Sequence, residues 1–269
     1  MVAYMEHKDL ANEVISRERA GQIRDGVHRV QEQIALAEAA AGRPKGSVQL
    51  LAATKTRDVA EIMAAIDAGI RFIGENRPQE VSAKAEGLER QCFERGLVWN
   101  PLDAEDGEGV TMHLIGQLQS NKISKIIDPV DTVESVDSLS LAQKLSRRMD
   151  ARDQYVNVYL EVNESGEEAK SGCLPQEAEE LAYQLAAMPG LKLRGLMTVG
   201  AHVDDERVIR AGFAHLRQLR DAIRSSGEPG TDQCSELSMG MTGDLALAIA
   251  EGSTLVRVGT AIFGERAFI

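Results

Sequence analysis

The chain has 269 residues, 43% of them hydrophobic, and a formal net charge of -12 at pH 7. This length suits one large α/β domain or two small ones, and the acidic balance argues against binding to nucleic acid or anionic membranes, which requires a basic surface. The three cysteines are widely spaced and no secretory or membrane-length apolar segment occurs, so we expect a cytoplasmic protein without disulfides or a metal site.

Predicted helices and strands alternate along the chain. A long charged helix is predicted from Asp9 to Ala41, where Gly42 and Pro44 end it. Eight β-rich runs follow, at residues 48–55, 71–75, 112–116, 132–137, 156–163, 193–199, 236–240 and 255–259. Helical patterns lie between them, at residues 59–68, 139–149, 176–187, 204–224 and 243–250.

This alternation predicts a single (β/α)8 TIM barrel that spans residues 1–269, with residues 1–45 forming an extra N-terminal helix packed on the barrel. A doubly wound open sheet is the alternative fold, although no G-x-G-x-x-G motif follows the first strand. The stretch 87–110 contains Pro101, Gly107, Gly109 and several acids, and we predict an irregular surface insertion there, before the third strand.

Lys55 ends the apolar run that forms the first predicted strand. Because side chains alternate along a strand, Leu51, Ala53 and Lys55 share one face. An ammonium group on an apolar face is partly desolvated, which makes it a better amine nucleophile. Such lysines form Schiff bases with carbonyl compounds that include pyridoxal 5′-phosphate (PLP). The alternative is a lysine that reaches from the strand end into water.

Active sites of TIM barrels lie at the C-terminal ends of the strands, and phosphate sites frequently follow strands seven and eight. After the seventh predicted strand, Ser238–Asp244 leads into a helix with Thr242 as its expected N-cap, and glycines there let the backbone approach an anion. Gly259 and Thr260 repeat this arrangement after the eighth strand.

Arg257 shares a strand face with Leu255 and Gly259, so it is buried if this face is the barrel interior. A buried guanidinium needs an anion, a carboxylate or an acceptor such as a ring nitrogen. An internal ion pair with Glu236 or Glu75 is the alternative to a ligand.

Seven motifs occur in one order at Leu51–Thr56, Gly74–Glu80, His113–Lys122, Lys170–Gly172, Leu193–Met197, Ser238–Met241 and Val256–Gly264. With them the chain resembles, over nearly its whole length, the YggS/PROSC-type pyridoxal phosphate-binding proteins, also called PLP homeostasis proteins. The single domain of that family is similar to the barrel of bacterial alanine racemase. The resemblance therefore implies PLP as the cofactor.

The resemblance also implies roles for individual residues. Lys55 matches the lysine that forms the internal aldimine, Asn76 a residue close to the cofactor ring, and Arg257 the arginine that faces the pyridine nitrogen. His113 and Met197 lie in motifs that line the site, and because His113 is predicted to begin a strand we expect a structural role for it. The residues that match the phosphate cradle are Ser238, Gly240, Gly259 and Thr260.

The sequence departs from the family pattern in three places. Arg57-Asp58 stands where a Lys-Pro pair is common, Met112 where Trp is usual, and Thr242-Gly243 where a Ser-Asp pair is frequent. The first departure puts in doubt a transfer role for a second lysine near Lys55.

Two functions from different classes are consistent with these residues. The resemblance implies a PLP carrier or regulator rather than an enzyme, involved in intracellular PLP homeostasis and amino-acid balance, with PLP-dependent apoenzymes as partners. The alternative is a PLP-dependent amino-acid racemase, which needs a second acid/base opposite the lysine. A Schiff-base aldolase would leave the family motifs unexplained.

Two observations favour the carrier. In alanine racemases the second acid/base is a tyrosine from a separate C-terminal domain and a neighbouring subunit, whereas this chain ends at Ile269 and has no tyrosine in a rim motif. We therefore also expect a monomer. An arginine beside the pyridine nitrogen disfavours ring protonation and so weakens the cofactor as an electron sink.

Overall fold

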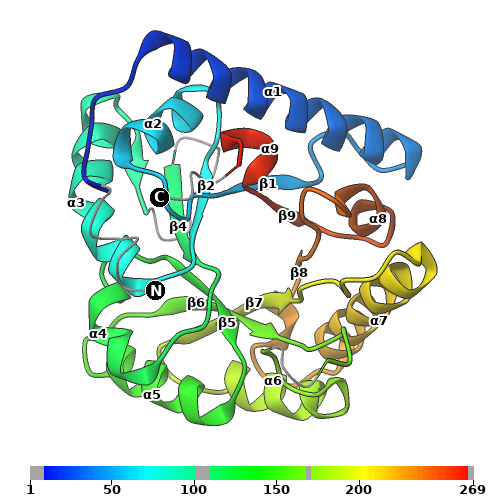
Figure 1. The fold of residues 1–269 in the computed structure, drawn as a ribbon. Coiled ribbons are helices and arrows are strands. Elements are labelled where there is room, and N and C mark those ends of the chain that lie inside the picture. Colours follow the sequence, from blue (N-terminus) through cyan, green and yellow to red (C-terminus); the bar gives the residue numbers. More distant parts are fainter. Residues whose placement is uncertain (1–8, 101–108, 168–170, 266–269) are drawn as a thin grey trace.

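Eight parallel strands close into a barrel (Figure 1). The computed structural model describes residues 9–100, 109–167 and 171–265. Around the ring the strands follow the order β1 (Gln49–Ala53), β2 (Phe72–Glu75), β4 (Gly109–Leu114), β5 (Thr132–Val136), β6 (Val156–Glu161), β7 (Leu191–Met197), β8 (Glu236–Ser238) and β9 (Leu255–Val258). Pairing of β1 with β9 closes the ring. The predicted TIM barrel and all eight of its strands are confirmed.

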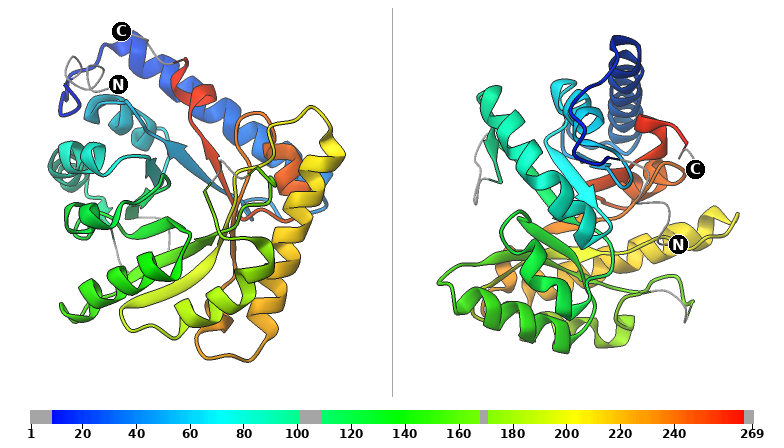
Figure 2. Two further views of the ribbon diagram at one scale, coloured as in Figure 1. Left: turned by 60° about the horizontal axis from the view of Figure 1, so that its bottom comes forward. Right: turned by 60° about the vertical axis from the view of Figure 1, so that its left-hand side comes forward.

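Helices surround the barrel (Figures 1 and 2). They are α1 (Arg17–Ala40), α2 (Val59–Asp67), α3 (Pro78–Glu94), α4 (Ile123–Ile126), α5 (Leu139–Asp150), α6 (Ala178–Ala186), α7 (Glu206–Ser225), α8 (Leu245–Ala250) and α9 (Thr260–Phe263). In the described part of the chain, 3-10 turns at Ser120–Lys122, Pro175–Glu177 and Thr231–Gln233 lie in the connections between strands and helices. No helix in the described part of the chain is long and apolar enough to cross a bilayer.

Helix α1 runs along one side of the barrel, over α2, α8 and α9 (Figures 1 and 2). It begins at Arg17 rather than at Asp9, because the Ser16 hydroxyl accepts a hydrogen bond from the Arg19 backbone N–H and caps the helix. Gly26 permits close contact with α9, since a Cβ there would lie 2.5 Å from the Ile262 carbonyl oxygen. The extra N-terminal helix thus packs where the last βα unit closes the barrel.

The predicted irregular stretch at 87–110 is wrong for residues 87–94, which complete α3. Pro78 occupies the first turn of α3, a favoured position for proline. Besides Pro78 and Glu80, the buried residues of the helix are Val81, Lys84, Leu88 and Cys92, at helical spacing. A lysine within this stripe interrupted the apolar pattern that predicts a helix. A short ninth strand, β3 (Val98–Trp99), pairs with β4, and residues 101–108 lie outside the described part.

The interior of the barrel has an apolar floor and a polar upper layer. Leu51, Tyr159, Met197 and Leu255 form a buried cluster there, separate from the larger core between the strands and the helices. The polar side chains His113, Glu134, Ser238 and Arg257 are buried as well. Because neighbouring side chains alternate between the two sides of each strand, these polar groups converge inside the barrel.

Candidate functional site

A cavity of about 490 Å³ lies at the C-terminal ends of the barrel strands. It brings together five of the seven predicted site residues, which come from three separate parts of the chain: Lys55, Asn76, Arg257, Gly259 and Thr260. The segment after β8 supplies Met241–Asp244, which belong to the predicted anion-binding turn. The segment after β7 supplies walls that the sequence did not predict: Val199, Ala201, His202 and Val203. These loop residues had no signal of their own, because loop walls show no periodicity.

Lys55 lies two residues beyond the end of β1. Leu51 packs in the interior cluster, while Ala53 and Lys55 line the cavity, as the alternation along the strand predicts. The Lys55 side chain is neither fully buried nor fully exposed. Lys55 is therefore partly buried at the wall of the cavity.

Asn76 offers an unsatisfied polar group at the cavity. Its Oδ1 atom is buried and has no hydrogen-bond partner among the described residues. The Asn76 backbone approaches β4 closely because residue 116 is glycine, and a Cβ there would lie only 2.3 Å from the Asn76 carbonyl oxygen. A buried amide oxygen without a partner is unfavourable, and a ligand that donates a hydrogen bond would correct this.

Arg257 is 6% exposed and is held by oxygens from β8 and from the segment after β7. Its Nη1 atom donates to the Ser238 carbonyl oxygen (2.7 Å) and hydroxyl (2.6 Å), and its Nη2 atom donates to the Thr198 carbonyl oxygen (2.8 Å). Burial lowers the pKa of Arg257, and the charges of Glu134, Glu161 and Asp244 oppose that shift.

The alternative of an internal ion pair with Glu236 or Glu75 is wrong in its partners, because the carboxylate that pairs with Arg257 is Glu134. Glu134 Oε2 lies 3.9 Å from Arg257 Nη1 and accepts a hydrogen bond from the Ser238 hydroxyl at 2.5 Å. Although burial alone would raise the pKa of Glu134, its contacts with His113 and Arg257 hold that pKa below its ordinary value.

His113 lies one residue from the end of β4, so the prediction that it begins a strand is wrong. Its Nδ1 atom is 2.6 Å from Glu134 Oε1, and the ring is 3% exposed. Glu134 thus joins His113 to Ser238 and Arg257. A glutamate in the fully buried strand Thr132–Val136 was the available sign that this residue serves the site.

Ser238 and Gly240 are buried and are absent from the cavity lining. Gly240 has φ +99, and a Cβ there would lie 2.6 Å from the Ala248 Cβ, so the turn after β8 requires glycine. Their roles in phosphate binding stay predictions. The expected N-cap at Thr242 is wrong, because α8 starts after Asp244, whose Oδ1 accepts from the Met241 N–H at 2.6 Å.

The unusual Arg57-Asp58 pair supports the fold around Lys55. Asp58 caps α2 by accepting the Glu61 backbone N–H at 2.9 Å. Arg57 donates to the Gly264 carbonyl oxygen at 2.8 Å and lies over the Phe263 ring. This pair therefore ties the start of α2 to the end of α9.

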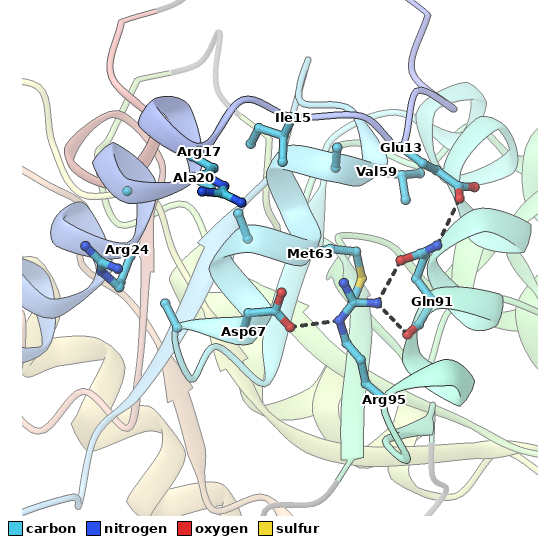
Figure 3. Close-up of a pocket in the computed structure, with 14 residues that line it drawn as sticks. Glu13, Ile15, Arg17, Ala20, Arg24, Val59, Met63, Asp67, Gln91 and Arg95 are labelled. Atoms are coloured by element: carbon cyan, nitrogen blue, oxygen red, sulfur yellow. Dashed lines mark hydrogen bonds and ion pairs between the residues drawn. The ribbon is translucent and has the colours of Figure 1, made fainter.

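A second cavity, of about 450 Å³, lies between α1, α2 and α3 (Figure 3). Several of its polar groups bind each other: Arg95 donates to Asp67 at 2.8 Å, and Gln91 donates to Glu13 at 2.9 Å. It contains none of the predicted site residues. Among the described residues, no group of three histidine, cysteine, aspartate or glutamate side chains is placed to hold a metal ion. The cavity at the barrel mouth is therefore the candidate site.

Known proteins resemble this chain over nearly its whole length. The family model described as alanine racemase, N-terminal domain, matches residues 19–267. A protein named pyridoxal phosphate homeostasis protein from Pseudomonas aeruginosa is 39% identical over 244 residues, which cover 91% of this chain and 96% of that protein.

Two solved structures resemble this chain over most of its length. A Bifidobacterium adolescentis protein described as unknown has a TM-score of 0.92 and 66% identity, covering 95% of this chain and 100% of the other. PipY of Synechococcus elongatus, solved with PLP bound, has a TM-score of 0.67 and 31% identity, covering 86% of this chain and 100% of the other.

Proposed function

We propose that this chain binds PLP in the cavity at the barrel mouth. The chain belongs to the alanine racemase N-terminal domain family and, within that family, to the pyridoxal phosphate homeostasis proteins. The protein then serves intracellular PLP homeostasis and amino-acid balance as a carrier or regulator. The observation that carries this proposal is that Lys55, Asn76 and Arg257 line one cavity of a size suited to a small cofactor.

The residues that line the cavity would hold different parts of the cofactor. The Lys55 amine condenses with the cofactor aldehyde to form a Schiff base, and one water molecule leaves. The buried Oδ1 atom of Asn76 accepts a hydrogen bond from the ligand, which satisfies the unpaired acceptor. Gly259 and Thr260 adjoin Arg257 at the end of β9 and receive the phosphate group.

Arg257 sets the electronic character of the site. PLP supplies an electron sink for amino-acid chemistry, and the strength of that sink depends on protonation of its ring nitrogen. Arginine has donors but no acceptor, so beside that nitrogen it donates a hydrogen bond and does not favour a proton there. The buried contacts to Ser238 and Thr198 prevent the guanidinium from turning away. This arrangement would leave the ring nitrogen unprotonated and so weaken the electron sink.

A PLP-dependent racemase is the alternative function, and His202 is the observation that favours it. His202 is exposed and lines the same cavity as Lys55, so it is a candidate for the second acid/base. Tyr159 is not, because it is buried below the cavity and burial holds the pKa of its hydroxyl well above the ordinary value.

Three assays on one preparation separate the two functions. PLP-loaded protein should reactivate a PLP-dependent apoenzyme, whereas a borohydride-reduced sample should not, because its cofactor is bound irreversibly. The loaded protein should racemise alanine far more slowly than about 1 s⁻¹, the low end of ordinary enzymes. Turnover near that rate which disappears in His202→Ala would establish the racemase instead. Protein that binds no PLP would exclude both functions.

A further inference from the structure

A buried ion cluster lies beneath Lys55 and involves Glu75, Glu80 and Lys84. The Lys84 side chain is fully buried, and its Nζ atom lies 2.7 Å from Glu75 Oε1 and 3.0 Å from Glu80 Oε2. A lysine is almost never fully buried unless it is paired, and breaking a buried pair leaves an uncompensated charge. The cluster lies near the candidate site at the barrel mouth, and it connects α3 to the end of β2.

The cluster forms hydrogen bonds with the residues on both sides of Lys55. Lys84 Nζ also donates to the Thr54 carbonyl oxygen at 3.1 Å, and the Thr54 hydroxyl donates to Glu75 Oε1 at 2.6 Å. On the other side, the Thr56 backbone N–H donates to Glu80 Oε2 at 2.6 Å. The three charged groups therefore fix the backbone immediately before and immediately after Lys55.

The backbone at Thr56 needs such support. Thr56 has φ +65, in the left-handed region that residues with a branched Cβ rarely adopt. Conformations of this kind persist only where surrounding contacts hold them. One such contact is the charge-assisted hydrogen bond from the Thr56 N–H to the Glu80 carboxylate, which is itself 1% exposed. The left-handed turn changes the direction of the chain between Lys55 and the start of α2.

The charges of the cluster are distributed unequally. Burial raises the pKa of Glu75 to about 7 against the opposing charge of Lys84, and the like charge of Glu80 adds to the rise. The pKa of Glu80 is lowered despite burial, because Lys84 and the Thr56 N–H stabilise its anion. Glu80 is therefore held as an anion that pairs with Lys84 and accepts the Thr56 N–H.

We propose that Lys84, Glu75 and Glu80 act as a clamp that positions Lys55 for Schiff-base formation. This inference rests on the proposed PLP binding and adds positioning residues to it. The clamp acts on Lys55 through the backbone of Thr54 and Thr56, so it should influence chiefly a ligand that reacts with the Lys55 amine. A cluster that merely joins α3 to the barrel would lower stability without discriminating between ligands that do and do not react with Lys55.

Two ligands that differ at one group provide the test. PLP carries the aldehyde that reacts with Lys55, whereas pyridoxine 5′-phosphate carries an alcohol and binds without reacting. Dissociation constants for both are measured on wild type, Lys84→Met and the control Lys125→Met, which removes an exposed lysine from α4. We expect Lys84→Met to weaken PLP binding at least about tenfold, to change pyridoxine 5′-phosphate binding less than about twofold, and Lys125→Met to change neither.

A rescue experiment isolates the left-handed turn. Glu80→Ala should weaken PLP binding, and Thr56→Gly in the same chain should restore most of it, because glycine adopts positive φ without strain. Glu89→Ala, an exposed position on the same helix, is the control. The single variant Glu80→Ala and the double variant with Thr56→Gly also test the clamp if Lys84→Met does not fold.

The possible results distinguish failure of the clamp from failure of the proposed function. Equal weakening of both ligands in Lys84→Met, or no rescue by Thr56→Gly, would overturn the clamp while leaving PLP binding intact. Wild-type protein that binds pyridoxine 5′-phosphate and PLP equally would refute the role of Lys55 in the proposed function itself. Selective loss of PLP binding together with rescue establishes the clamp.

Discussion

Arg257 Nη1 lies 2.6 Å from the Ser238 hydroxyl oxygen, and that hydroxyl in turn donates to Glu134 Oε2 at 2.5 Å. Ser238 therefore accepts from the cation and donates to the carboxylate, which keeps Arg257 and Glu134 apart at 3.9 Å. A serine from β8 thus orients a guanidinium from β9 against a carboxylate from β5. The orientation of Arg257 toward the cavity depends on all three strands.

Replacing Ser238 by alanine should disturb this arrangement. Both Arg257 and Glu134 would lose a hydrogen bond in a buried position, so we expect a loss of about 1–3 kcal/mol in the free energy of unfolding. Urea unfolding of the PLP-free protein measures it, with Ser140→Ala on the exposed side of α5 as the control. An unchanged unfolding free energy would mean that Arg257 does not depend on this hydroxyl.

Lys55 should carry the cofactor. We expect purified protein loaded with PLP to be yellow, borohydride to attach the cofactor to Lys55, and Lys55→Ala to lose the colour. Peptide mapping of the reduced protein by mass spectrometry locates the adduct. Lys122→Ala, which changes another lysine of the family motifs, should remain yellow. An adduct on Lys122 or Lys170 instead would show that Lys55 is not the reactive amine.

The phosphate group should dominate the non-covalent part of PLP affinity. A charge-assisted hydrogen bond contributes about 1.5–3 kcal/mol, so PLP should bind at least about tenfold more tightly than pyridoxal, which reacts with the same lysine. Titration of the PLP-free protein with both aldehydes measures the ratio. The ratio should fall in Thr260→Val, because Thr260 lines the cavity beside Gly259. Equal affinities of wild type for both aldehydes would rule out a phosphate site.

Glu161 should make stability dependent on pH. It lies at the end of β6, and burial, followed by the like charge of Asp137, raises its pKa from 4.5 to about 7. A carboxyl whose pKa is raised on folding stabilises the folded state fully below pH 4.5, and this contribution disappears as the pH rises to about 7.

The variant Glu161→Gln lacks this titration. Relative to wild type, it should therefore gain stability between pH 4.5 and pH 8, by about 3.5 kcal/mol at most, since one pKa unit corresponds to about 1.4 kcal/mol. Unfolding free energies of both proteins across this range test the slope, with Glu32→Gln on the exposed face of α1 as the control. A constant difference between Glu161→Gln and wild type at every pH would contradict the prediction.

The eight strands of the barrel and the positions of Lys55, Asn76 and Arg257 at their ends were predictable from the sequence. Period-two alternation and apolar runs are local properties, and a barrel places all C-terminal strand ends on one rim. The family motifs pointed to the same residues. Helix α3 was not predicted, because buried Lys84 occupies a position where the helical pattern calls for an apolar side chain.

The sequence by itself determined the order of the elements, the apolar face that ends in Lys55, and the motifs that identify the family. Only the tertiary structure decided which partners the buried charged groups contact. Glu134 and Ser238 are 104 residues apart, and Lys84 reaches Thr54 across 30 residues. Periodicity specifies which face of an element is buried, but the partner of a buried charge depends on the register of neighbouring strands and on how each helix packs. Those relations exist only once the barrel has closed.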